Sequence, residues 1–330
     1  MLKGIYLLDE PAYRKIYREE VRAQISQWVQ IDAPPQTSQS IATNMSLLED
    51  IDVLFSGWGC PRLTAEFLDH APRLKAVFYG AGSIHYFVTD AFWEKGILVS
   101  TAYEANDIPV SEFALSQILL SLKGYWQHVN WIKGGGAWWD RLPAAGDYGS
   151  TVGLISLGKV GSMVAEHLKR FDLHVLAYDP FATQEVAQKL NVELCTLDEI
   201  FIRSDVVSLH APWLPETERM ITGQHFASMK KGASFINTAR GAIVREDEMI
   251  AVLKERPDLY ALLDVTYPEP PEPGSPLWQL PNVIITPHIA GPNEAECRRN
   301  GQYVLAELKR YLNGEPLRFA MTREKVASMA

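Results

Sequence analysis

Short apolar runs alternate with amphipathic stretches along most of the chain. Apolar runs bounded by polar or glycine-containing segments predict buried strands, and apolar residues spaced three and four apart predict helices. The expected strands are residues 2–8, 52–55, 74–78, 97–100, 150–156, 173–179, 205–210, 234–239, 259–265 and 282–288. The expected helices are residues 11–29, 61–72, 89–95, 110–129, 157–171, 183–190, 197–203, 246–255 and 293–313. Strands that alternate with helices predict parallel sheets and an α/β fold.

Three segments add to this pattern. The expected helix 110–129 is apolar almost all round, which predicts that it is buried or lies in an interface. The glycine-rich segment 133–150 predicts a loop whose tryptophan pair packs against another surface, and a loose tail is expected from about residue 321. A second series of strands and helices begins near Ser150, and the closing helix 293–313 lies beyond it. We therefore expect this helix to return to a discontinuous first domain.

A glycine-rich turn joins the expected strand 150–156 to the following helix. The usual dinucleotide fingerprint is G-x-G-x-x-G, followed about 20 residues later by an acidic residue that takes the ribose hydroxyls. Asp179 lies 18 residues after the last glycine, at the end of the next strand. The six fingerprint positions are Ser156, Leu157, Gly158, Lys159, Val160 and Gly161. The segment predicts a dinucleotide site, and the alternative is a structural turn without a ligand.

Three charged residues follow expected strands of the second series. Arg240 lies in NTARG, Glu269 in DVTYPEPPEP, and His288 ends NVIITPH. An arginine fork binds a carboxylate, and a histidine gives or removes a proton near neutral pH. A nearby glutamate would orient the imidazole and keep it protonated. Each residue alone has a structural explanation, but the three beside a dinucleotide fingerprint indicate catalysis.

Composition narrows the class of protein. A length of 330 residues suggests about two domains, and 31 Lys+Arg against 40 Asp+Glu give a net charge of −9. This balance disfavours nucleic acid and anionic membranes as partners. The cysteines Cys60, Cys195 and Cys297 are far apart, so we expect no disulfide framework and no metal site. An amino terminus that turns acidic early and the lack of a long apolar run predict a cytoplasmic protein without a signal peptide.

Four segments together resemble the D-isomer-specific 2-hydroxyacid dehydrogenases. They are VGLISLGKVG, SLHAPWLPETERMI, NTARG and LDVTYPEPPEPGSPLWQLPNVIITPHIAG. The resemblance covers nearly the whole chain and is looser over the first hundred residues. It implies a Rossmann-type NAD-binding domain inserted in a flavodoxin-like substrate-binding domain, with boundaries at 1–102, 103–289 and 290–330. It also implies a homodimer built largely on the cofactor domain.

The resemblance assigns roles to individual residues. Arg240 would anchor the substrate carboxylate, His288 would be the general acid/base, and Glu269 its partner. Asp264 would contact the nicotinamide end of the cofactor. The backbone of Tyr79, Gly80, Ala81, Gly82 and Ser83 would also hold the substrate carboxylate. The further cofactor-binding residues that it implies are His210, Ala211, Pro212, Thr217, Thr238 and Ala239, together with Arg240 and His288.

The chain departs from the family pattern at several positions. Ser156 replaces the first fingerprint glycine, Ile84 stands where many relatives have an acidic residue, and Pro292-Asn293 replaces a Ser or Thr. These departures bear on which substrate the protein uses more than on which reaction it catalyses. Large aromatic residues expected in loops are Trp58, Trp138, Trp139, Trp213 and Trp278. Contact with the substrate, packing and dimer contact are all open for each of them.

The leading hypothesis is NAD-dependent interconversion of a small 2-oxo acid and the D-2-hydroxy acid. A formate dehydrogenase is one alternative. In that branch, however, the partner of the histidine resembles a Gln where this chain has Glu269, and the chains tend to be longer. The other alternative is a non-catalytic NAD-binding regulator of the corepressor type, which an intact set of Arg240, Glu269 and His288 disfavours. The sequence leaves open which acid is used and in which direction.

Overall fold

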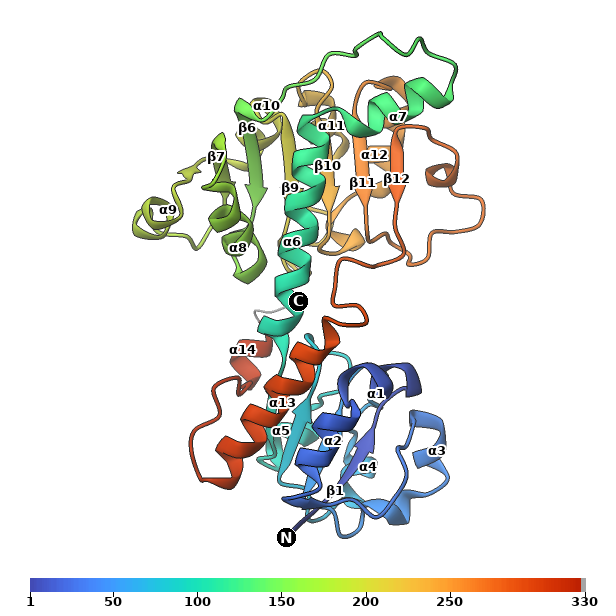
Figure 1. Ribbon diagram of the computed structural model, residues 1–330, viewed down its shortest axis with the longest axis vertical. Coiled ribbons are helices and arrows are strands. Elements are labelled where there is room, and N and C mark those ends of the chain that lie inside the picture. Colours follow the sequence, from blue (N-terminus) through green and yellow to red (C-terminus); the bar gives the residue numbers. More distant parts are fainter. Residues whose placement is uncertain (328–330) are drawn as a thin grey trace. The chain divides into compact units, whose positions relative to one another are not determined.

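The computed structural model describes residues 1–327, which divide into two compact units. Unit 1 is Met1–Asp107 together with the chain from Pro292 onwards, and unit 2 is Ile108–Gly291. Each unit has helices packed on a parallel sheet (Figure 1), so the predicted α/β class is confirmed. Within residues 1–327, no helix combines the length and the apolar character needed to cross a membrane.

Unit 1 contains a parallel sheet with the strand order β2-β1-β3-β4-β5. This is the order of flavodoxin-like sheets. The strands are β1 (Leu2–Leu7), β2 (Val29–Gln30), β3 (Val53–Ser56), β4 (Ala76–Tyr79) and β5 (Leu98–Thr101). The helices are α1 (Glu10–Ile16), α2 (Glu19–Ile25), α3 (Ser38–Ala42), α4 (Ala65–Asp69), α5 (Asp90–Glu94), α13 (Cys297–Leu312) and α14 (Arg323–Ala327).

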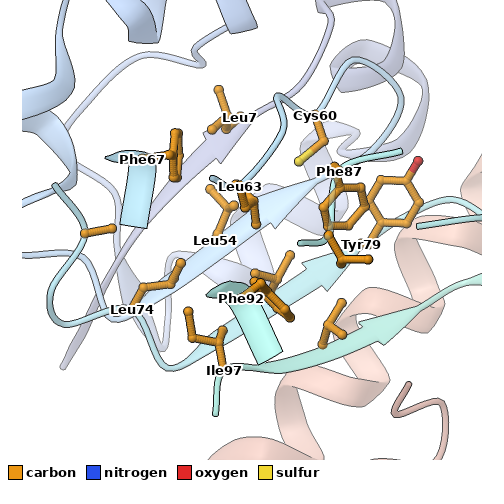
Figure 2. Packing of buried hydrophobic residues seen from close by; sticks show 14 of the residues in the cluster. Leu7, Leu54, Cys60, Leu63, Phe67, Leu74, Tyr79, Phe87, Phe92 and Ile97 are labelled. Carbon is orange, nitrogen blue, oxygen red and sulfur yellow. The ribbon is translucent and has the colours of Figure 1, made fainter. Parts of the chain in front are cut away.

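The sheet of unit 1 separates two hydrophobic cores. Leu54 of β3 belongs to the core under α4 and α5 (Figure 2), whereas its neighbour Phe55 belongs to the core under α1, α2 and α13. Helix α13 contributes Val304 and Leu308 to this second core. Helix α13 therefore returns to the first unit, as the element order predicts.

Unit 2 contains a parallel sheet with the strand order β12-β11-β10-β9-β6-β7-β8. This is the Rossmann order with one strand added at the edge. The strands are β6 (Tyr148–Ile155), β7 (Asp172–Tyr178), β8 (Glu193–Leu194), β9 (Val206–Leu209), β10 (Ser234–Asn237), β11 (Tyr260–Leu263) and β12 (Val283–Ile285). The helices are α7 (Tyr125–Lys133), α8 (Lys159–Leu168), α9 (Gln184–Leu190), α10 (Leu197–Arg203), α11 (Gly223–Ser228) and α12 (Glu246–Glu255), and α6 (Tyr103–Leu122) begins in unit 1 and continues into unit 2.

The prediction of one helix over 11–29 is wrong, because α1 and α2 are separated at Tyr17. The Tyr17 hydroxyl is buried and donates a hydrogen bond to the Ser56 carbonyl at 2.7 Å. At the same break, a Cβ on Gly301 would lie only 2.3 Å from the Ile16 carbonyl oxygen. Close packing of α13 and the buried tyrosine thus override the helical periodicity.

The prediction of one helix over 110–129 is also wrong. The chain forms α6 and α7, and Gly124 between them has a left-handed φ of 61° that a helix does not continue. In the following loop, Trp138 and Trp139 are 68% and 81% exposed, so the expected packing of this pair is absent from the described chain. The expected loose tail is helical over α14, and residues 328–330 lie outside the described residues.

Candidate active site

The expected site residues of unit 2 follow strands of a single parallel sheet, whose carboxyl ends all meet at one edge. Ligands bind at this edge in open α/β sheets. The segments are Ser156–Gly161 after β6, Asp179 after β7, His210–Pro212 after β9, Thr238–Arg240 after β10, Asp264 after β11 and His288 after β12. The structure therefore brings the unit 2 candidates to one edge, while Tyr79–Ser83 belongs to unit 1.

The turn after β6 forms an open cradle for an anion. Helix α8 begins directly after Gly158, and within residues 1–327 the backbone N–H groups of Val160 and Gly161 donate no hydrogen bond. A Cβ on Gly158 would meet nothing closer than Ser156 Oγ at 3.5 Å, whereas a Cβ on Gly161 would lie 2.0 Å from the Ser156 carbonyl oxygen. Gly161 thus permits close helix–strand packing, and the space above Gly158 fits the pyrophosphate of a dinucleotide.

Ser156 connects this turn to Asp179. Its backbone has a left-handed φ of 79°, and its Oγ accepts a hydrogen bond from the Gly158 N–H at 3.2 Å. The same hydroxyl donates to Asp179 Oδ2 at 3.4 Å, and the Leu157 N–H donates to that oxygen at 2.7 Å. Asp179 Oδ1 accepts from the Phe181 N–H at 2.8 Å. These bonds fix the carboxylate beside the glycine turn, where the fingerprint places the ribose.

Two buried polar groups near the same edge have no partner within residues 1–327. They are Nδ1 of His210 and the hydroxyl of Thr238. Nε2 of His210 lies 3.0 Å from the Ser208 hydroxyl, and burial lowers the pKa of His210 to about 4, so the ring is neutral. Thr217 instead donates to the Pro212 carbonyl at 2.5 Å and fixes the loop after β9. A polar ligand at this edge would satisfy the two unpartnered groups.

His288 and Glu269 form a close pair. Nδ1 of His288 lies 2.6 Å from Oε1 of Glu269, and the two side chains are 48% and 41% exposed. Because a carboxylate only accepts hydrogen bonds, Nδ1 carries a proton and Nε2 is left for another partner. His288 has a left-handed φ of 54°. The backbone is thus bent to present the imidazole at the strand end.

Asp264 fixes the segment that carries His288. Its Oδ1 accepts hydrogen bonds from the Thr286 hydroxyl at 2.6 Å and from the Ile289 N–H at 2.8 Å. Its Oδ2 accepts from the Ala290 N–H at 2.8 Å. The buried carboxylate therefore binds the chain on both sides of His288 and stabilises its unusual backbone conformation.

Arg240 is a partly buried cation that forms no ion pair within residues 1–327. Its Nη1 donates to the Ala239 carbonyl at 2.7 Å. Burial lowers the pKa of Arg240, and the charge of Glu269 acts in the opposite direction. A guanidinium in this situation is suited to bind an anion from outside the chain.

Sequence reasoning missed residues that hold Arg240 in place. Asn237 donates from Nδ2 to the Arg240 carbonyl at 3.1 Å and accepts at Oδ1 from the Ala239 N–H at 3.0 Å. A Cβ on Gly241 would lie 2.0 Å from the carbonyl carbon of Thr266, so the turn packs directly on the chain before Glu269. A polar Asn at the end of a buried strand was a readable signal, but the approach of Gly241 to Thr266 was not.

The segment Tyr79–Ser83 of unit 1 forms a turn with several unbonded backbone N–H groups. The Gly80 N–H donates to the Ser56 carbonyl at 2.9 Å, and Asn300 Nδ2 donates to the Gly80 carbonyl at 3.0 Å. These bonds fix the turn after β4. In the described chain, the next three N–H groups, those of Ala81, Gly82 and Ser83, donate no hydrogen bond.

Comparison with known proteins defines the family. Residues 115–290 match the D-isomer specific 2-hydroxyacid dehydrogenase, NAD binding domain. The chain belongs to the D-isomer specific 2-hydroxyacid dehydrogenase family, and this region is its NAD-binding domain.

Individual relatives differ in length. The chain is 34% identical over 271 residues to D-3-phosphoglycerate dehydrogenase of Methanocaldococcus jannaschii, covering 81% of this chain but only 51% of that protein, so it spans about half the length of this relative. It is 29% identical to glyoxylate reductase of Korarchaeum cryptofilum, covering 96% and 94% of the two chains. The NAD-complexed D-isomer specific 2-hydroxyacid dehydrogenase of Lactobacillus delbrueckii ssp. bulgaricus has the same fold, with a TM-score of 0.79, 23% identity and coverage of 97% and 100%.

Proposed function

We propose that the protein is an NAD-dependent oxidoreductase that interconverts a small 2-oxo acid and the D-2-hydroxy acid. The observation that carries this proposal is the His288–Glu269 pair at 2.6 Å on the sheet edge that also bears the unpaired cation of Arg240. A proton donor and a carboxylate anchor are the groups that reduction of a 2-oxo acid requires.

The proposed roles follow from the geometry. Arg240 binds the substrate carboxylate with its guanidinium fork, because this cation has no ion-pair partner of its own. NADH, held by the turn Ser156–Gly161 and Asp179, would supply the hydride that C2 of the oxo acid accepts. His288 donates a proton from Nε2 to the carbonyl oxygen on which negative charge develops, and Glu269 holds the ring through Nδ1. In the reverse direction, neutral His288 removes the hydroxyl proton.

We further propose that unit 1 is the substrate-binding domain. The free N–H groups of Ala81, Gly82 and Ser83 suit a second set of hydrogen bonds to the substrate carboxylate. Tyr79 and Gly80 fix this turn at the end of β4. The proposed domain boundaries remain 1–102, 103–289 and 290–330.

The cofactor proposal is NAD rather than NADP. Asp179 would accept the adenosine ribose hydroxyls, and its charge would repel a 2′-phosphate. Pro180 and Phe181 follow it, so no arginine is adjacent in the chain to bind that phosphate. The proposed contacts to the rest of the cofactor come from the turn Ser156–Gly161, from His210, Ala211, Pro212, Thr217, Thr238 and Ala239, and from Asp264.

We also propose a homodimer formed by α7 and the loop that follows it. Tyr125, Trp131, Trp138 and Trp139 are exposed there, at 45%, 38%, 68% and 81%. Exposed aromatic groups of this kind mark protein–protein interfaces. The net charge of −9 supports a protein without a nucleic-acid partner, and three free cysteines support a cytoplasmic location.

The test is NADH oxidation by the purified protein with a panel of 2-oxo acids. We expect turnover of at least one acid with formation of the D-hydroxy acid. His288→Ala should lower kcat by roughly 10²–10⁴-fold, the range for a lost general acid. His174→Ala, an exposed histidine on β7, is the matched control and should retain activity. Unchanged turnover in His288→Ala would refute the mechanism, and no turnover by the wild type would favour a non-catalytic NAD-binding protein.

A further inference from the structure

Trp58 lies across the carboxyl end of the unit 1 sheet. Its side chain packs against both hydrophobic cores of the unit, one on each face of the sheet. Because the strands separate these cores, a side chain that contacts both must pass over the ends of the strands. Trp58 follows β3, so its indole lies at the edge where Tyr79–Ser83 leaves the neighbouring strand β4.

Tyr86 provides a second aromatic ring at this edge. Its hydroxyl donates to the Gly57 carbonyl at 3.2 Å and lies 3.0 Å from the Tyr79 hydroxyl. These contacts connect the segment after the 79–83 turn to the residue before Trp58, while 47% of Tyr86 remains exposed. Figure 2 shows the Tyr79 hydroxyl at the end of the strands to which the arrowheads point. We call Trp58 and Tyr86 the aromatic edge.

The ionisable groups that act on Tyr86 are neutral or acidic. Burial raises the pKa of Tyr86 to about 12 and that of the Cys60 thiol to about 12, so both groups are uncharged at neutral pH. The charged group that acts on Tyr86 is Asp9, whose carboxylate lies directly against Gly59. A carboxylate beside two aromatic rings disfavours a second anion.

Three basic residues of unit 1, Lys15, Arg18 and Arg62, either have other partners or line another part of the surface. Lys15 forms an ion pair with Glu294 at 3.0 Å, and Arg18 donates to the Glu294 carbonyl at 3.0 Å. Arg62 lines a groove with His85 and Trp93 on the side of α4 and α5. None of these three is held against the aromatic rings by a contact in the described chain.

We propose that the aromatic edge binds the substrate side chain and selects 2-oxo acids with an uncharged apolar or aromatic side chain over phosphorylated ones. This inference rests on the proposed function, in which the 79–83 turn holds the substrate carboxylate. Burying an apolar side chain of this size contributes about 1.5–3 kcal/mol, or roughly 10–100-fold in kcat/KM. A phosphate would lose water without gaining a cation.

The experiment compares kcat/KM with NADH for glyoxylate, 4-methyl-2-oxopentanoate, phenylpyruvate and 3-phosphohydroxypyruvate. The two apolar acids should exceed glyoxylate by roughly 10–100-fold, and the phosphorylated acid should be the poorest. Trp58→Ala should remove most of the apolar preference through a higher KM, with a smaller loss for glyoxylate. Trp58→Phe keeps a ring and should retain most of that preference.

Trp93→Ala is the matched control, because Trp93 packs against the same core from α5. It should leave the ratio between apolar acids and glyoxylate unchanged. A preference for 3-phosphohydroxypyruvate, or equal losses for all acids in both Trp58 variants, would overturn the inference and leave the proposed function intact. A wild type that reduces other 2-oxo acids of the panel but neither apolar acid would overturn this inference alone. A wild type that reduces no 2-oxo acid at all would refute the proposed function, and this inference with it.

Discussion

The two units present different chemistry at the carboxyl ends of their sheets. Unit 2 presents Arg240, Glu269 and His288, and hydrogen bonds from neighbouring chain segments fix this charged set. Unit 1 presents the backbone N–H groups of 81–83 beside the neutral rings of Trp58 and Tyr86. Charged groups serve a reaction that all 2-oxo acids share, whereas an aromatic edge distinguishes their side chains. Changes in unit 2 should therefore affect every substrate alike, and changes in unit 1 should depend on the substrate.

The largest effect is expected from Gly158→Val. The branched side chain would occupy the open space above the turn after β6, where the structure leaves only Ser156 Oγ within 4 Å of a Cβ. We expect NADH binding, measured by fluorescence titration, to be lost. Gly274→Val is the control, because a Cβ there meets nothing within 4 Å. Normal NADH binding by Gly158→Val would show that the cofactor does not use this turn.

Asp264→Asn should be the next most damaging change. An amide at this position cannot accept all three hydrogen bonds from Thr286, Ile289 and Ala290. The loss should destabilise the folded protein by ~1–3 kcal/mol and displace His288. Calorimetry should show a lower Tm, and kcat should fall by a similar factor for all oxo acids. A loss confined to one acid would contradict the division between the units.

The sequence predicted the unit 2 edge well because its signals are local. A strand, a glycine turn and Asp179 at a fixed spacing identify a dinucleotide site, and buried strands that end in Arg240 or His288 place those side chains at one edge. The strand positions and the return of α13 follow from the same hydrophobic pattern. What the residues of unit 2 do remains a prediction that the variants above test.

The features that sequence reasoning missed depend on contacts between distant segments. Asp264 binds the turn that carries His288, and Gly241 packs on Thr266, but neither contact has a local pattern. The break between α1 and α2 depends on the buried Tyr17 hydroxyl and on α13. Trp58 was one aromatic residue among several, and only its contacts with both cores of unit 1 distinguish it.

Glu269→Gln should lower kcat by less than the changes above. Oε1 of Glu269 lies 2.6 Å from Nδ1 of His288 and holds the ring. The amide oxygen of glutamine can still accept that hydrogen bond, but without the charge that strengthens it. We expect kcat to fall by roughly tenfold, the equivalent of ~1.4 kcal/mol, and by the same factor for every oxo acid. Glu269→Ala, which leaves Nδ1 without this acceptor, should lower kcat further, and an unchanged kcat in both variants would show that Glu269 does not position the ring.

The smallest effect is expected from Ser156→Gly, at the first position of the glycine-rich turn of unit 2. Glycine would relieve the left-handed backbone at φ 79°, a gain of about 1 kcal/mol in the free energy of unfolding. It would also release the Gly158 N–H, which the serine hydroxyl now occupies at 3.2 Å. We expect a slightly higher Tm and NADH binding that is unchanged or up to about fivefold tighter, the equivalent of ~1 kcal/mol. Ser156→Ala separates the two causes, because it removes the hydroxyl and keeps the strained Cβ. Weaker NADH binding in both variants would mean that the hydroxyl itself, through its bond to Asp179, positions the ribose-binding carboxylate.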